Sequence, residues 1–147
     1  MREPESTLWS ESAHVTAYLN SQQIRMGRRL AFGIDVPESM RGARMPPLML
    51  LTLAENAIKH GLAPSPKGGR IDLTAATEDG RLRVQVADTG QGFAKSAGGG
   101  TGLANIRARP GALFGDAASL SLMLNNPHGV VATVVLPYQA AALRAPP

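Results

Sequence analysis

Cysteine is absent from this chain of 147 residues, so neither a disulfide nor a thiolate zinc site is possible. Aromatic residues make up only 4% of it. The chain therefore lacks the aromatic side chains on which single-stranded nucleic-acid binders stack bases. Long hydrophobic runs are also missing, since the longest, residues 48–54 and 130–136, are far too short to cross a bilayer. No charged-then-apolar leader opens the chain. We therefore expect one cytoplasmic globular domain with a single core and no nucleic-acid partner.

The net charge of +4 reflects 15 basic against 11 acidic residues. A basic surface attracts nucleic acids, phosphates or acidic proteins. The arginines of the early chain stand apart, however, at positions 25, 28, 29, 41 and 44. We interpret them as a solvated basic face.

Apolar spacing predicts two long helices in the first half of the chain. Residues 10–27 carry apolar positions three and four apart and stop at Gly27, whereas residues 1–9 are expected to form an irregular end. Pro46-Pro47 opens the second helix, because a proline in the first turn loses no hydrogen bond, and Gly61 is its end signal. The expected buried stripe of this helix is Leu48, Leu51, Ala54, Ile58 and Leu62.

Alternating apolar and polar residues predict five strands, at residues 28–36, 70–77, 81–87, 119–124 and 130–136. Asp79-Gly80 is a strong hairpin signal between the second and third of them, and residues 102–109 have a short helical pattern. Strands joined by hairpins are antiparallel. The sequence therefore predicts an α+β fold, a two-layer sandwich of a mixed, mostly antiparallel sheet with helices on one face.

Four polar residues share one face of the second helix. Because the apolar stripe points inward, Glu55, Asn56, Lys59 and His60 lie on the opposite side. A carboxylate, an amide, a positive charge and an imidazole are thus within reach of one ligand. Taken alone, the same pattern is typical of the wet face of any amphipathic helix.

An aspartate and two glycines follow the third predicted strand, in the order Asp88-Thr89-Gly90-Gln91-Gly92. A carboxylate at a strand end can accept hydrogen bonds from an amino group such as that of adenine. Glycine lets the backbone approach a flat ring without a Cβ in the way. The alternative interpretation is a tight turn, in which Asp and Gly are also common.

A glycine-rich segment, residues 98–102, leads directly into the short predicted helix. This arrangement directs backbone N–H groups and the positive end of a helix dipole at an anion, and Thr101 adds a hydroxyl that can cap the helix. No Gly-Lys-Ser/Thr follows, so the segment is not a Walker loop, and its spacing is not that of a dinucleotide site. A plain linker is the alternative for residues 94–99.

Taken in this order, the three segments resemble the N, G1 and G2 boxes of the GHKL superfamily, whose ATP-binding domain is the Bergerat fold. Residues 46–61, from Pro-Pro-Leu to Glu-Asn-Ala-Ile-Lys-His-Gly, are most similar to sensor histidine kinases of the LytS type. Residues 102–107 (Gly-Leu-Ala-Asn-Ile-Arg) and 113–116 (Leu-Phe-Gly-Asp) resemble the same group. Residues 11–29 resemble the helix that joins their dimerisation region to the ATPase domain. The resemblance covers nearly the whole chain.

The resemblance implies a role for each motif residue. Asn56 would coordinate the Mg²⁺ that bridges the phosphates, and Glu55 would be the catalytic acidic residue that polarises the attacking group. Lys59 and His60 would contact phosphate oxygens, and Asp88 would take the adenine amino group. The other ATP-binding positions would shape the base pocket or close over the phosphates as a lid: Gly90, Gly92, Gly100, Thr101, Gly102 and Leu103.

Two positions depart from the family pattern. The family has a threonine at the start of its last strand where this chain has Val130, and the lost polar contact is worth roughly 0.5–1.5 kcal/mol. Pro110 stands where such kinases continue a helix, and a proline inside a helix costs ~3 kcal/mol. We expect altered lid closure but intact nucleotide binding.

The resemblance also implies three parts: residues 1–28 as a tail and linking helix from the dimerisation region, 29–138 as the histidine-kinase-like ATPase domain, and 139–147 as a disordered tail. ATP and Mg²⁺ are the implied cofactors. A phosphoacceptor-histidine dimerisation domain and a downstream response regulator are the implied partners, within a dimeric, membrane-bound parent whose cytoplasmic part this chain represents.

The phosphoacceptor histidine of such kinases lies in a segment resembling Pro-His-Phe-Leu-Phe-Asn, which this sequence lacks. We interpret His14 as a helix-surface residue and His128 as a turn residue. The chain is therefore expected to be a protein-histidine kinase catalytic domain that acts on a histidine outside this chain and does not autophosphorylate alone. The alternatives are a serine kinase of the anti-sigma-factor type, which shares the boxes, and a non-catalytic nucleotide-binding or interaction module, which Val130 and Pro110 would favour.

Overall fold

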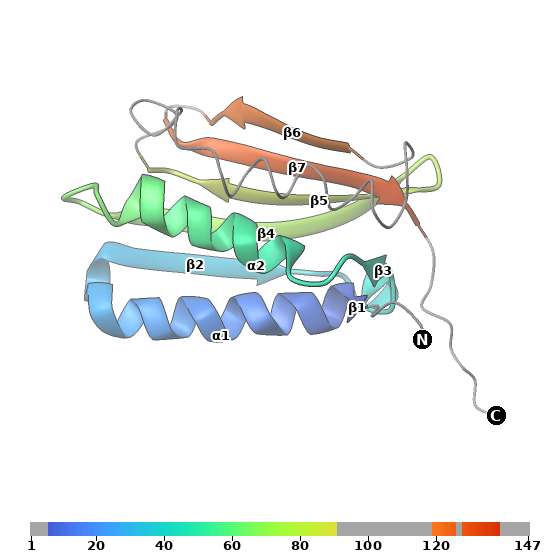
Figure 1. Ribbon diagram of the computed structural model, residues 1–147, viewed down its shortest axis with the longest axis horizontal. Helices are drawn as coiled ribbons and strands as arrows, with labels where there is room; N and C mark the ends of the chain where they lie inside the picture. The colour runs from blue at the N-terminus through green and yellow to red at the C-terminus, as the bar shows by residue number, and fades with distance from the viewer. Residues whose placement is uncertain (1–5, 91–118, 126–127, 139–147) are drawn as a thin grey trace.

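A five-stranded mixed sheet is the frame of the protein (Figure 1). The strand order is β2-β4-β5-β7-β6; β2 and β4 are parallel and every other neighbouring pair is antiparallel. The strands are β2 (Leu30–Asp35), β4 (Gly69–Glu78), β5 (Arg81–Asp88), β6 (Ser119–Leu124) and β7 (Val130–Pro137). All five predicted strands are therefore present, each within two residues of the predicted bounds at its start.

The computed structural model describes residues 6–90, 119–125 and 128–138. Several predictions fall outside these ranges: the glycine-rich segment, the short helix at residues 102–109, Pro110 and the tail at residues 139–147. The predicted site residues outside the described ranges are Gly92, Gly100, Thr101, Gly102 and Leu103.

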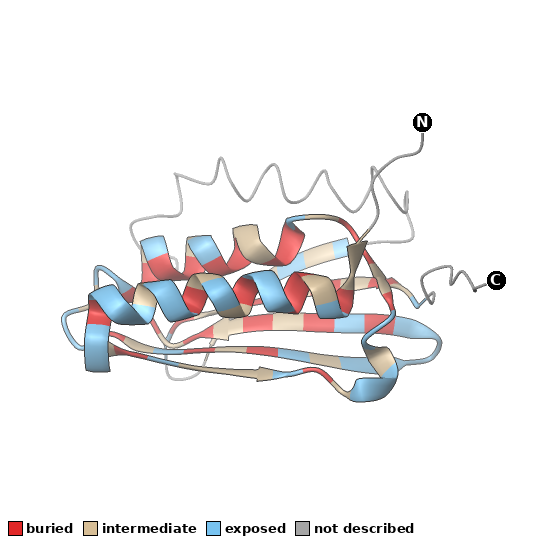
Figure 2. Ribbon diagram, turned by 90° about the horizontal axis from the view of Figure 1, so that it is seen from below, coloured by how far each residue is buried: buried red, intermediate tan, exposed pale blue. Residues whose placement is uncertain are grey.

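Helices cover one face of the sheet (Figures 1 and 2). They are α1 (Leu8–Met26), α2 (Met49–Asn56) and the π-helical continuation of α2, η3 (Ala57–Leu62). Buried side chains of the helices meet the inward-facing side chains of the strands in one hydrophobic core. The predicted two-layer α+β sandwich is confirmed. Within the described residues, no helix is long and apolar enough to cross a membrane.

Helix α1 begins earlier than its apolar pattern indicated. The Thr7 hydroxyl accepts a hydrogen bond of 3.1 Å from the backbone N–H of Ser10 and so caps the helix. Residues Ser6–Thr7 form β1, which pairs with β3 (Arg44–Met45) in a separate two-stranded sheet. The prediction of an irregular end over residues 1–9 is therefore wrong for residues 6–9. Gly27, with φ of 60°, ends the helix as predicted.

The β4–β5 hairpin follows the sequence prediction closely. Asp79 and Gly80 both have positive φ, 52° and 75°, as a type I′ turn requires. Glu78 pairs with Arg81 across this turn, and the register then runs to the pair Ile71 and Asp88. The hairpin thereby brings Asp88 to the end of the sheet where β4 begins.

The second helix differs from the prediction at its start. It begins at Met49, two residues after the Pro46-Pro47 pair, because Leu48 adopts a left-handed conformation with φ of 66°. This turn exposes 48% of the Leu48 surface, and Leu51 is only half-buried, so both assignments to the buried stripe are wrong. The buried residues of α2 and η3 are Met49, Leu50, Leu53, Ala54, Ala57, Ile58, Gly61 and Leu62.

Candidate functional site

The polar face predicted for the second helix exists, although its second half is not an ordinary α-helix. The backbone N–H of Ala63 donates to the carbonyl of Ile58, five residues earlier, over 2.8 Å. Such π-helical turns occur frequently at functional sites. Glu55 and Lys59 are exposed, and Asn56 and His60 are half-buried.

The amide of Asn56 has a defined orientation. Its Nδ2 donates to the carbonyl of Thr52 over 3.1 Å, one turn back on α2. With the nitrogen held by the helix backbone, the amide oxygen is the atom that Asn56 offers to a ligand. An amide oxygen is a suitable ligand for a hard cation such as Mg²⁺, which takes one or two protein oxygens and completes its shell with phosphate oxygens and water.

Asp88 ends β5 as a buried carboxylate with 4% of its surface exposed. The backbone N–H of Gly90 donates to Oδ1 over 2.8 Å, and the backbone N–H of Val130 also donates to the carboxylate. Burial raises the pKa of the Asp88 carboxyl above its ordinary value, while these two N–H groups and the nearby His128 lower it by less. A buried carboxylate that is fixed at a strand end can recognise a hydrogen-bond donor with strict geometry.

The strand end and the helix touch through glycines. A Cβ built on Gly61 would lie 3.0 Å from Oδ1 of Asp88, and a Cβ built on Gly90 would overlap the carbonyl group of Gly61. Side chains at either position would push η3 away from the end of β5. The contact brings the helix that carries Asn56 to the strand end that carries Asp88.

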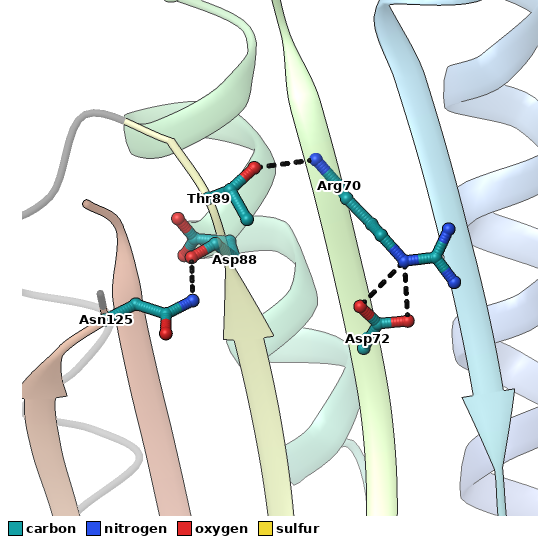
Figure 3. Close-up of polar contacts among 5 residues, drawn as sticks. All are labelled: Arg70, Asp72, Asp88, Thr89 and Asn125. Atoms are coloured by element: carbon teal, nitrogen blue, oxygen red, sulfur yellow. Dashed lines mark hydrogen bonds and ion pairs between the residues drawn. The ribbon is translucent and has the colours of Figure 1, made fainter. Parts of the chain in front are cut away.

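Thr89 fixes the same strand end to β4. Its Oγ1 accepts the backbone N–H of Arg70 over 2.9 Å, and its own backbone N–H donates to the Arg70 carbonyl over 3.0 Å. Figure 3 shows the first of these hydrogen bonds, between the Thr89 hydroxyl and the Arg70 backbone, with Asp88 beside it. The Arg70 side chain forms an ion pair with Asp72 on β4, 2.9 Å long.

The connection between β6 and β7 makes contacts that the sequence did not indicate. Nδ2 of Asn125 donates to the Asp88 carbonyl over 2.8 Å (Figure 3), and Nδ1 of His128 lies 2.9 Å from the Gly90 carbonyl oxygen. Gly129, with φ of 110°, lies directly against the Asp88 carbonyl. The only sequence signal was a turn between two strands, because pairing across about 37 residues has no local pattern.

Substitution of Gly129 by alanine is expected to lower the free energy of unfolding by about 2–4 kcal/mol, since the new Cβ would overlap the Asp88 carbonyl and φ is unfavourable. Urea unfolding monitored by circular dichroism measures this change. Gly80→Ala, with positive φ but no atom within 4 Å, should lose only about 1 kcal/mol. Gly42 has neither a positive φ nor an atom within 4 Å of an added Cβ, so Gly42→Ala should leave the free energy of unfolding close to that of wild type. An equally small loss of stability in Gly129→Ala would contradict the packing described.

The raised pKa of Asp88 gives a second expectation. Because the folded carboxyl has a higher pKa than the unfolded one, the folded state binds more protons between about pH 4 and the raised pKa. The contribution of Asp88 to stability therefore falls as pH rises through this window. We expect the unfolding free energy of wild type, relative to that of Asp88→Asn, to decrease from pH 4 towards neutrality. If the difference in unfolding free energy between the two proteins did not change with pH, folding would not raise the pKa of the Asp88 carboxyl.

These elements define an α+β ATPase-type domain, with an amide-bearing helix set against a strand-end carboxylate. The sequence profile of the histidine kinase-, DNA gyrase B- and HSP90-like ATPases matches residues 46–140, and the chain belongs to this family. The match confirms the family predicted from the three motif segments.

Similar proteins fit this assignment. The sensor histidine kinase/phosphatase LytS of Staphylococcus aureus strain MRSA252 is 33% identical over 147 residues, covering 90% of this chain and 25% of LytS; LytS of strain N315 gives the same values. The chain thus spans about a quarter of the length of these relatives.

Solved structures share the fold. The catalytic domain of histidine kinase ThkA superposes with a TM-score of 0.69 at 15% identity, covering 93% of this chain and 97% of that one. Full-length ShkA in complex with AMPPNP gives 0.66 at 23% identity, covering 97% and 33%.

Proposed function

We propose that this chain is the ATP–Mg²⁺-binding catalytic domain of a sensor histidine kinase, and that it transfers the γ-phosphoryl group of ATP to a histidine outside the chain. The observation that carries the proposal is the buried Asp88 carboxylate, which lies at the end of β5 in contact with Gly61 of the helix that bears Asn56. One end of this arrangement suits a base and the other suits phosphates.

The adenine end of the site is Asp88 with its glycine neighbours. Its carboxylate already receives two backbone N–H groups, which fix its plane, and its remaining acceptor capacity suits the adenine amino group. Because Gly61 and Gly90 lack side chains, no Cβ stands between the end of β5 and η3 beside the carboxylate. Both features support recognition of a flat purine at this point.

The phosphate end of the site is the polar face of α2 and η3. The Asn56 amide oxygen would hold the metal ion, which neutralises phosphate charge when bound. Lys59 and His60, one exposed and one half-buried, would contact phosphate oxygens, and Glu55 would polarise the attacking imidazole. Phosphoryl transfer needs mainly positioning and charge neutralisation, and these groups supply both.

Phosphoryl transfer exchanges one bond at the γ-phosphorus for another. The bond between the γ-phosphorus and the β,γ-bridging oxygen breaks, a bond from the γ-phosphorus to an imidazole nitrogen of the acceptor forms, and ADP leaves with the electron pair of the broken bond. The proton on the other imidazole nitrogen would pass to the Glu55 carboxylate and from there to water. The ATP-binding roles of Gly92, Gly100, Thr101, Gly102 and Leu103 rest on the family resemblance.

Helix α1 supports a signalling role for residues 1–28. Tyr18 on α1 has a raised hydroxyl pKa, caused first by burial and then by the negative charge of Glu55, so the helix reaches the neighbourhood of the proposed catalytic acid. We propose that this segment leads from a phosphoacceptor-histidine dimerisation domain into the ATPase domain at residues 29–138. A response regulator and a dimeric, membrane-anchored parent complete the proposal.

Calorimetric titration with a non-hydrolysable ATP analogue, with and without Mg²⁺, tests the proposal. We expect binding that Mg²⁺ strengthens, and no stable phosphohistidine when the chain alone is incubated with labelled ATP. Absence of nucleotide binding would favour a plain interaction module. Phosphorylation of a protein serine, stable to acid, would favour the anti-sigma-factor type of kinase.

A further inference from the structure

The connection between β6 and β7 contacts two residues at the end of β5, Asp88 and Gly90. Asn125 donates to the carbonyl of Asp88 over 2.8 Å, Gly129 packs against the same carbonyl, and His128 bonds the carbonyl of Gly90 over 2.9 Å. The backbone N–H of Asn125 donates to the Gly129 carbonyl over 2.9 Å, which closes the connection on itself. Three residues of the connection, Asn125, His128 and Gly129, therefore contact the strand end.

Gly90 is bound on both sides. Its N–H donates to Oδ1 of Asp88, and its carbonyl oxygen is the partner of the His128 ring. The orientation of the Asp88 carboxylate depends on the first bond, and the position of Gly90 depends on the second. His128 thus acts on the carboxylate through Gly90 and has no need to touch a ligand itself.

We propose that His128 is a positioning residue of the nucleotide site: it holds Gly90 so that the Asp88 carboxylate stays oriented for the base. This inference rests on the proposed function, in which Asp88 receives the adenine amino group. It assigns to an exposed turn histidine a role in affinity that its place in the sequence did not indicate.

The proton positions on His128 follow from its partner. A carbonyl oxygen only accepts, so Nδ1 must carry a hydrogen in the neutral and in the charged ring. The neutral and the charged ring can therefore both make the hydrogen bond to Gly90. A positive charge on the ring lowers the pKa of the Asp88 carboxyl and so favours its ionised form.

The elements next to the end of β5 carry other ionisable groups. Lys59 and His60 lie on η3, and the Arg70–Asp72 pair lies on β4. The charge that acts on the Asp88 carboxyl, among the described residues, is that of His128. A variant that keeps the hydrogen bond but removes the charge can therefore separate the two contributions.

Two substitutions make this separation. His128→Asn keeps an N–H donor at the same number of bonds from the backbone as Nδ1 and cannot titrate, whereas His128→Phe keeps the ring and removes the donor. His14→Phe on the exposed surface of α1 is the matched control. The measurement is the dissociation constant of AMPPNP with Mg²⁺, by calorimetry, at pH values from about 5.5 to 8.5.

At pH 8, His128→Phe should bind roughly threefold to tenfold more weakly than wild type, the value of one net hydrogen bond. His128→Asn should match wild type at pH 8 and lose affinity at a higher pH than wild type as the solution is acidified. A side chain that only fills space would not show this pattern, in which the variant that keeps the donor, His128→Asn, retains the affinity that His128→Phe loses.

Binding by both His128 variants that equals wild type and His14→Phe at every pH would overturn the inference, provided that Asp88→Asn weakens binding. Absence of binding by the wild-type chain would instead overturn the proposed function. Should His128→Phe unfold, His128→Leu removes the donor in its place: binding equal to wild type overturns the inference, and weaker binding that His128→Asn does not share supports it.

Discussion

Replacement of Asp88 by asparagine is expected to weaken ATP binding by roughly 10- to 100-fold. A hydrogen bond to a charged group contributes about 1.5–3 kcal/mol, which corresponds to that range of dissociation constants. Asparagine offers one acceptor in place of a carboxylate that faces its donors with two oxygens, and its amide nitrogen would repel the adenine amino group or the backbone N–H of Val130. Asp88 is 4% exposed, so water cannot replace the missing acceptor.

Calorimetry with an ATP analogue and with its guanine counterpart measures both affinity and base preference. The preference for adenine should shrink in Asp88→Asn along with the affinity. Asp72→Asn is the matched control, because Asp72 makes an ion pair with Arg70 on β4 and is partly exposed, and it should bind as wild type does. Wild-type affinity in Asp88→Asn, with an unchanged circular dichroism spectrum, would place the base elsewhere.

The sheet could be predicted because its signals are local. Period-two alternation predicts which residues of β4 and β5 face the core. Asp79-Gly80 predicts the two-residue turn that joins these strands, because both residues accept the positive φ of that turn. The polar face with Asn56 followed from helical spacing in the same way. Asp88 was recognisable because a polar residue that ends an apolar strand stands out in the pattern.

Other features depend on contacts between distant segments. The π-helical turns of η3 coincide with the close approach of Gly61 to Gly90, and helical spacing alone cannot distinguish them from an α-helix. The strands β1 and β3 have two residues each, too few for any periodic signal. Helical spacing predicts that Leu48 belongs to the buried stripe, but its left-handed backbone turns it outward.

The contacts of the β6–β7 connection could not be predicted from the sequence for a related reason. Asn125 and His128 bond backbone carbonyls of residues that precede them by 37 and 38 positions. Backbone carbonyls have no residue identity, so no pattern in the sequence could pair them. Polar contacts from side chain to backbone are thus the part of a site that depends most on the three-dimensional structure.

Replacement of Asn56 by alanine should remove the dependence of nucleotide binding on Mg²⁺. The Asn56 nitrogen is bound to the Thr52 carbonyl, so the amide oxygen is the group that the substitution takes from the ligand. Loss even of an outer partner of a metal ligand costs roughly 10- to 100-fold in metal affinity, and loss of the ligand itself should cost at least as much. The fold should persist, because alanine is the better helix former and the lost hydrogen bond is worth about 1 kcal/mol.

The decisive measurement is the ratio of AMPPNP affinities in Mg²⁺ and in EDTA, which should be well above one for the wild-type chain and close to one for Asn56→Ala. Asn20→Ala, at an exposed position of α1, should keep the wild-type ratio. Asp88→Asn should also keep it while binding weakly in both conditions, because Asp88 would contact the base and Asn56 the phosphates through the metal. An Asn56→Ala protein that still binds more tightly in Mg²⁺ would mean that another residue holds the ion, and the two ends of the site would then have to be assigned anew.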